Sequence, residues 1–220
     1  MPNVTIGQST FNLSSEVLEG ILESIELVKK DGLEHGFMFC DPGDGIVPGT
    51  KCTGNACSVK IKECEGGAKE VGSFHTHPTV MSFSMMDYIT ALANAHHHPQ
   101  NKNLMCVSLL DKGLRCKSVT SLPPKDTFFK TIDSESNRET IKPYFSPKVS
   151  INLDQIHSLL KGVAWEDLGT AETVIALDEG DVVMSKPPAE TSQAEDLAEA
   201  KKALAQVSHF SQEDIAAIHG

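Results

Sequence analysis

Positive charge is scarce in this sequence. Lys and Arg together number 19, against 30 Asp and Glu, so the formal net charge is −11. Non-specific affinity for nucleic acid comes from Lys and Arg side chains that displace counterions from phosphates. This charge balance therefore argues against nucleic acid as a partner.

Long apolar runs are also missing. No stretch approaches the roughly 20 apolar residues of a transmembrane helix, so we expect no membrane span. The segment MPNVTIGQSTFNLSSEV at the start has neither a basic region nor an apolar run of about seven residues, and we expect no secretory signal. Six cysteines without such a signal favour a reducing compartment, where they would be free thiols or metal ligands. These absences together predict a soluble cytoplasmic protein.

The remaining composition is that of an ordinary globular protein, with 40% hydrophobic and 22% charged residues. A length of 220 residues suits one domain plus an extension, or two small domains. We expect a catalytic domain over 1–122, a polar, proline-punctuated linker or irregular connection over 123–150, and an extension of unknown role over 151–220. Within the extension, the pattern predicts a hairpin over 172–184, an Ala-rich helix over 189–207 and a short helix over 211–218.

Two segments of the first domain have the apolar spacing of amphipathic helices. Residues 14–32, SSEVLEGILESIELVKKDG, follow a Ser cap and end at Gly32, which suits a helix C-terminus. From Ser84, the segment MMDYITALANAHHH places its apolar residues on one face, and we expect its helix to stop near Pro99.

Several short apolar runs between turn signals predict strands. We expect strands over 35–40, around 57–61 and over 70–77, and a hairpin with its turn at 111–113. The order helix, strands, helix, strands indicates a mixed α/β or α+β sandwich.

The stretch GSFHTHPTVMSFSMMDY, residues 72–88, carries the main chemical signal. Residues i and i+2 of a strand point to the same side, so His75 and His77 should project together. Pro78 ends that strand, and Ser84 begins the next helix with Asp87 one turn in. Two histidines and a carboxylate, with a fourth position left to water, are the composition of catalytic zinc sites.

These residues resemble a known motif. The sequence H-T-H-P, five further residues and S-M-M-D is similar to the JAMM motif of the MPN-domain zinc metalloproteases, the family of JAMM deubiquitinases. The upstream segment EHGFMFC, 34–40, resembles the Glu-x-Gly strand that follows the long first helix in that family. The usual family form has six residues between the proline and the serine, one more than this chain. The resemblance covers roughly residues 10–120.

The resemblance implies an MPN-like mixed sheet sandwiched by helices, with one zinc ion per chain. It also implies roles for five residues: His75, His77 and Asp87 as zinc ligands, Glu34 as general acid/base, and Ser84 as a donor to the oxyanion. Glu70 lies closer in sequence to the histidines, but it is five residues before His75 and would face the opposite side of a regular strand.

The activity that the resemblance implies is zinc-dependent hydrolysis of an amide at the C-terminal tail of a ubiquitin-like or sulfur-carrier-like protein. The bond can be an isopeptide or a linear peptide, because the zinc chemistry is the same. The alternative is a catalytically silent MPN-type scaffold that binds partners. A zinc deaminase is disfavoured, because the H-x-E and P-C-x-x-C signature is absent.

The cysteines leave a second metal site open. Cys52, Cys57 and Cys64 could supply sulfur ligands to a structural zinc ion, but no fourth ligand follows clearly. Buried or free thiols are therefore the favoured interpretation. Cys106 and Cys116 lie on the two arms of the expected hairpin, where we expect cross-strand neighbours that need not be bonded.

Two further clusters have ordinary explanations. The three consecutive histidines 96–98 point in different directions and suit a solvated helix C-terminus. Met81, Met85 and Met86 suit core packing, with a groove for a substrate tail as the alternative. Ser84 and Asp87 are also an ordinary helix start, which is compatible with their roles at a metal.

Overall fold

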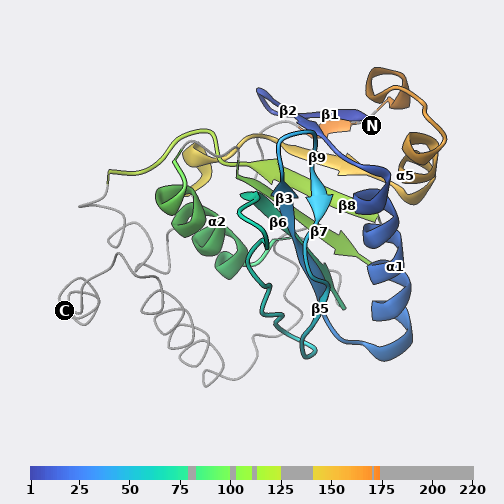
Figure 1. Ribbon diagram of the computed structural model, residues 1–220, viewed down its shortest axis with the longest axis horizontal. Helices are drawn as coiled ribbons and strands as arrows, with labels where there is room; N and C mark the ends of the chain where they lie inside the picture. The colour runs from blue at the N-terminus through green and yellow to red at the C-terminus, as the bar shows by residue number, and fades with distance from the viewer. Residues whose placement is uncertain (79–82, 100–102, 111–112, 125–140, 170, 174–220) are drawn as a thin grey trace.

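The computed structural model describes residues 1–78, 83–99, 103–110, 113–124, 141–169 and 171–173 (Figure 1). Its main sheet contains β3 (His35–Asp41), β4 (Val47–Pro48), β5 (Cys52–Thr53), β6 (Lys69–His77), β7 (Leu104–Leu109), β8 (Gly113–Ser118), β9 (Lys148–Ile151) and β10 (Ala171–Thr173). The strands follow the order β10-β9-β8-β7-β6-β3-β4, and β5 also pairs with β3. All described pairs in this sheet are antiparallel except β6 with β7. The expected mixed α/β class is confirmed.

Helices cover both faces of this sheet (Figure 1). One face packs against α1 (Ser15–Asp31) and α5 (Leu153–Leu160), and the other packs against α2 (Met85–His97). Strand β7 shows the division, because Leu104 and Cys106 join the core on the α1 side, while Met105 and Val107 join the core on the α2 side. The period of two along a strand produces this alternation.

Both expected helices of the first domain are present with their expected caps. At the start of α1, the Ser14 hydroxyl accepts a hydrogen bond from the Val17 N–H at 3.3 Å. The helix ends at Gly32, whose φ of 70° lies in the left-handed region that favours glycine. Helix α2 begins after its cap residue Ser84 and ends at His97, close to the expected stop.

The parallel pair β6–β7 requires the crossover connection that contains α2. Parallel neighbours need a crossover connection, and here α2 lies in the connection between the end of β6 and the start of β7. The chain therefore passes from His77 at the end of β6 to Ser84 at the start of α2 within seven positions.

Some elements lie outside the expected pattern. A hairpin of β1 (Asn3–Ile6) and β2 (Ser9–Asn12) was not predicted. Strand β9 follows the 3-10 helix Lys142–Tyr144 and pairs with β8, so the sheet continues past residue 122. A second 3-10 helix covers Trp165–Leu168. Of the hairpin expected over 172–184, all but two residues lie outside the described residues, as do both helices expected after it.

The strand expected around 57–61 is absent, and that prediction was wrong. The segment has no buried residue, so it has no face to pack on the sheet. The Asn55 side chain instead accepts hydrogen bonds from the N–H groups of Cys57 and Ser58, at 2.8 and 2.9 Å. Such side-chain bonds compete with strand pairing and favour a turn. The short strand β5 lies just before this turn.

The cysteines differ from the expectation of free thiols. Cys106 and Cys116 are disulfide-bonded across β7 and β8, and Cys40 of β3 is bonded to Cys64. The register of the β7–β8 pair places the first two directly opposite each other, with Cα atoms 4.2 Å apart. Only Cys52 and Cys57 are free. The thiol argument for a reducing compartment therefore no longer holds. No described helix is long and apolar enough to span a bilayer.

Candidate metal centre

The end of β6 and the start of α2 bring three polar side chains together. His75 and His77 are two residues apart on β6, so both project to the α2 face. Asp87 belongs to the first turn of α2 and is held by a reciprocal cap. The Ser84 N–H donates to Asp87 Oδ2 at 2.6 Å, and the Asp87 N–H donates to Ser84 Oγ at 3.2 Å. The cap fixes the carboxylate at the helix start, facing the histidines.

The three donor groups converge on one point. His75 Nε2 lies 2.9 Å from His77 Nε2 and 3.1 Å from Asp87 Oδ1, and His77 Nε2 lies 3.6 Å from Asp87 Oδ2. One ligand atom from each residue can be chosen so that all three lie within 4.8 Å of one another. Zinc bonds of 2.0–2.1 Å place the donor atoms of a tetrahedral site about 3.3 Å apart. The observed separations fall on both sides of that value, so these residues could hold a metal ion.

The local charges fit the same interpretation. Burial would raise the pKa of Asp87, but the neighbouring His75 and His77 and the Ser84 N–H outweigh it and lower the pKa to about 2. Burial lowers the pKa of His75, but the negative charge of Asp87 outweighs burial, so the pKa of His75 is raised. Two ring nitrogens that face each other at 2.9 Å share at most one proton between them. Two protonated nitrogens at this distance would repel each other, whereas a cation bound between the rings would be coordinated by both lone pairs.

Glu34 lies on the same face of the sheet as the histidines. Gly36 of β3 pairs with His75, and the continued register brings Glu34, two residues earlier, opposite His77. A side chain at Gly36 would collide with β6, because an added Cβ would lie 2.5 Å from the Phe74 carbonyl oxygen. Glycine at this position allows β3 to approach β6 closely beside the site.

The Glu34 carboxyl is buried and electrostatically linked to the site. Only 5% of the residue is exposed, and this burial is the main reason that its pKa rises to about 7. His75 lowers the pKa and Asp87 raises it, by smaller amounts. A carboxyl with a pKa near neutrality can both accept and release a proton, as a general acid/base must.

The backbone of Glu34 is held by the loop after β5. Its N–H donates to the Asn55 carbonyl and its carbonyl accepts from the Gly54 N–H, both at 2.8 Å. These contacts were not predicted from the sequence. The available signal was the Gly54-Asn55 pair, which is typical of a turn; its side-chain bonds form the turn described above, and its backbone N–H and carbonyl bind Glu34.

Ser84 has a structural role and retains chemical capacity. Its hydroxyl oxygen accepts the Asp87 N–H in the cap, and a hydroxyl that accepts one bond still has its own proton to donate. The two roles expected from the sequence are therefore compatible in this geometry.

Glu70 lies away from this cluster, although not for the reason expected. The pairing of β3 and β6 shifts register between Phe39 and Cys40, so β6 does not alternate regularly between Glu70 and His75. Glu70 instead accepts the Cys64 N–H at 3.2 Å and lies 3.8 Å from His98, at the far end of α2. A second metal site of Cys52, Cys57 and Cys64 is not formed, because Cys64 is in a disulfide.

Two other expectations have mixed outcomes. The histidines 96–98 end α2, and His98 is exposed, while His96 and His97 are partly buried. Met81 and the side chain of Met85 lie outside the described residues, so the role of the Met cluster stays a prediction.

The ligand chemistry allows two metals. Two histidines and one carboxylate with open positions are typical of catalytic zinc, and the same set also suits non-haem Fe(II). The described residues contain one group of His, Cys, Asp and Glu side chains close enough to share an ion, and it is this one. No protein-family model matches the chain, and no curated protein matches it significantly.

Proposed function

We propose that this protein is a zinc-dependent isopeptidase or peptidase of the JAMM type. The observation that carries the proposal is the convergence of His75, His77 and Asp87 on one point, with a buried carboxyl, Glu34, on the same face. The sequence resemblance to the JAMM motif names the same four residues for these roles. Ligands and base come from three separate elements, β6, α2 and the residue before β3.

Each residue has a distinct task in amide hydrolysis. Zinc held by His75, His77 and Asp87 would supply a Lewis acid that makes water a nucleophile near neutral pH and polarises the carbonyl of the substrate. Glu34 accepts the proton of the attacking water and then donates a proton to the leaving amine. The Ser84 hydroxyl donates a hydrogen bond to the carbonyl oxygen as negative charge develops there. Burial of Glu34 favours this cycle, because its pKa of about 7 makes both proton transfers accessible near neutral pH.

The proposed substrate is the C-terminal tail of a ubiquitin-like or sulfur-carrier-like protein. An extended tail can add as a strand to a sheet edge. The edge of β3 beside Glu34 is already paired with β5, at His35 and Gly36. Within the described residues β5 has one strand partner, so a tail that adds as a strand would pair with β5 or with the loop after it.

The first test is metal content. We expect about one zinc per chain in untagged protein purified without chelator, and none in the variant H75A/H77A. The control H157A removes an exposed histidine of α5 and should keep the metal. Iron in place of zinc would contradict the proposed chemistry and favour an oxygenase-type site.

The second test is turnover. The substrate is a ubiquitin-like protein carrying a fluorogenic amide at its C-terminus, and E34Q should keep zinc and lose turnover. Glu19 is an exposed glutamate of α1, and E19Q should be as active as the unmodified chain. Near-normal turnover of E34Q would show that Glu34 is not the base. Absence of metal, even after reconstitution, would favour the silent scaffold.

A further inference from the structure

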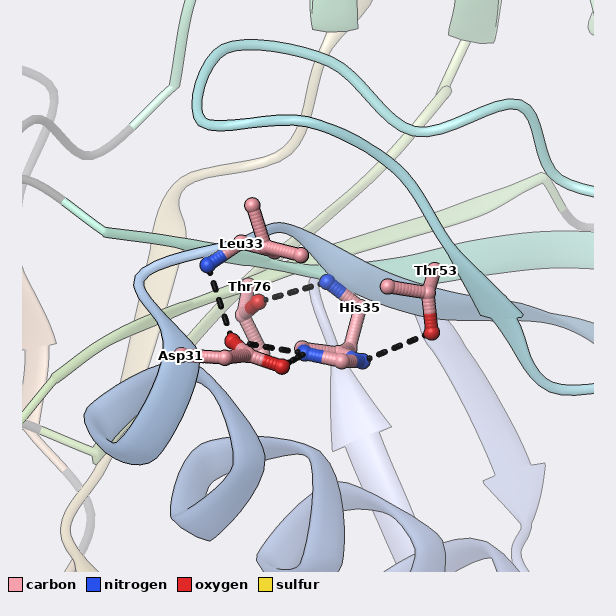
Figure 2. A network of polar contacts seen from close by, with 5 residues as sticks. All are labelled: Asp31, Leu33, His35, Thr53 and Thr76. Carbon is pink, nitrogen blue, oxygen red and sulfur yellow. Dashed lines mark hydrogen bonds and ion pairs between the residues drawn. The ribbon is translucent and has the colours of Figure 1, made fainter.

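A second polar cluster lies on the other face of the same two strands. Figure 2 shows His35 at its centre, between Asp31 and Thr53. The His35 Nε2 atom lies 3.1 and 3.0 Å from the two carboxylate oxygens of Asp31, and Nδ1 lies 3.2 Å from Thr53 Oγ1. The backbone N–H of His35 donates to Thr76 Oγ1 at 2.9 Å. Three segments, the end of α1 and the strands β5 and β6, therefore contact His35 of β3, the first two through its imidazole and β6 through its backbone N–H.

The contacts define which atoms donate. An ionised carboxylate only accepts hydrogen bonds, so His35 Nε2 carries a proton and donates a hydrogen bond to Asp31. The Leu33 N–H donates to the same carboxylate at 2.9 Å. These two bonds lower the pKa of Asp31, with the Leu33 N–H as the larger cause. Asp31 thus bridges the first residue after Gly32 to the first residue of β3.

This cluster encloses the residue proposed as the base. Glu34 lies between Leu33 and His35, both of which are tied to Asp31. The Glu34 backbone is held from the other side by the loop that follows Thr53. Thr76 lies between the two histidine ligands, and its side chain points away from them, is fully buried and holds the His35 N–H. Asp31 therefore holds the chain on both sides of Glu34, through the Leu33 N–H on one side and the His35 imidazole on the other.

We propose that His35 is a positioning residue, and that its contact with Asp31 sets the Glu34 carboxyl in place beside the metal ligands. This inference rests on the proposed function for its effect on turnover. His35 touches none of the three ligands through a described hydrogen bond or ion pair, because it faces α1 while the ligands face α2. Its removal should therefore change the placement of the base and leave the metal site intact.

The test separates positioning from general stability. H35L removes every side-chain hydrogen bond of His35, whereas H35Q keeps a donor for Asp31. T53V removes only the hydroxyl that faces Nδ1. T50V is its matched control, because Thr50 lies just before β5 and its hydroxyl donates to Glu65 at 3.1 Å.

The measurements are kcat and KM on the fluorogenic ubiquitin-like substrate, zinc affinity by chelator competition, and amide hydrogen exchange of each purified protein. Partners that orient a site typically change activity by 10–100-fold, so we expect kcat of H35L to fall by about that factor. KM and zinc affinity should stay within about threefold, since the ligands are untouched, and H35Q should recover most of kcat. Exchange at the Leu33 and Glu34 amides should accelerate by roughly tenfold in H35L, because the segment loses one of its two ties to Asp31 and keeps only the Leu33 N–H bond.

Each outcome decides the inference. Unchanged kcat in H35L overturns it, and so does a parallel loss of zinc affinity that H35Q does not restore. If H35L fails to fold, D31A decides, because it removes the acceptor of His35 Nε2 from an exposed helix end: a kcat below that of E19Q supports the positioning role, and equal values overturn it. If the unmodified chain binds no zinc or cleaves nothing, the proposed function fails, and amide exchange alone tests the contact. Unchanged exchange would then overturn it.

Discussion

Burial of Glu34 predicts a pH-dependent stability that can be measured without any substrate. The Glu34 pKa is about 7 in the folded chain, against an ordinary value of 4.5. Each pKa unit corresponds to about 1.36 kcal/mol, so this difference of about 2.5 units is worth about 3 kcal/mol. The sign is destabilising, because burial penalises the ionised form. The folded chain holds the proton that the unfolded chain has already released between these two values.

The metal-free chain should therefore lose stability as pH rises from 4.5 to 7. E34Q carries no ionisable group at this position and should not show that loss. The raised pKa of His75 gives a loss in the same direction. Its main cause, the charge of Asp87, is present in both proteins and cancels in the comparison, and only the smaller part due to the Glu34 charge differs. We expect the difference in unfolding free energy between E34Q and the unmodified chain to change by about 3 kcal/mol, in favour of E34Q, between pH 4.5 and 7.5.

Urea denaturation of chelator-treated protein at several pH values measures this difference. The control E19Q changes an exposed glutamate and should run parallel to the unmodified chain. Added zinc should reduce the slope, because a nearby cation favours the ionised carboxyl. A difference between E34Q and the unmodified chain that stays flat with pH would refute the burial argument, and with it the physical basis for Glu34 as a neutral-pH base.

Other predictions concern single contacts. S84A should lose about 0.5–2 kcal/mol of stability with the α2 cap and about 10²–10³ in turnover with the donor, while S84T should keep most of both in denaturation and fluorogenic assays. T76V leaves the buried His35 N–H without its acceptor, and urea denaturation should show a cost of about 1–3 kcal/mol. Alkylation of the folded chain without reductant, followed by mass spectrometry, should modify Cys52 and Cys57 alone; four or more labelled cysteines would contradict the disulfides.

The elements that determine the site were predictable because their signals are local. The Ser14 and Ser84 caps, the left-handed Gly32 and the period of two through His75 and His77 each depend on residues within a few positions of one another. The β1–β2 hairpin had a similar local signal in the turn at Gly7, with its φ of 62°, between alternating apolar residues. It was missed because each strand has only four residues.

Long-range contacts were not predictable in the same way. The Cys40–Cys64 disulfide spans 24 positions, and the bond from the His35 N–H to Thr76 Oγ1 spans 41. Sequence alone does not give the strand register that brings such partners together. Glu70 shows the same limit, since the register shift in the β3–β6 pair cannot be read from the regular alternation that we assumed. The three candidate ligands could be grouped from the sequence because His75 and His77 share one strand and Asp87 is fixed by a cap, whereas Glu34 came from the resemblance to the JAMM motif.

In the proposed enzyme, the two faces of β3 and β6 would separate metal binding from placement of the base. His75 and His77 project toward α2, while Thr76 and His35 project toward α1, because successive residues of a strand alternate between faces. Substitutions on the α1 face should therefore change turnover at constant metal content, whereas substitutions of the ligands should change both. A scaffold that only binds partners has no need of the metal ligands on the α2 face, nor of residues on the α1 face that hold Glu34 in place. Turnover that varies while zinc content stays constant across the α1-face variants would thus be a property of an enzyme.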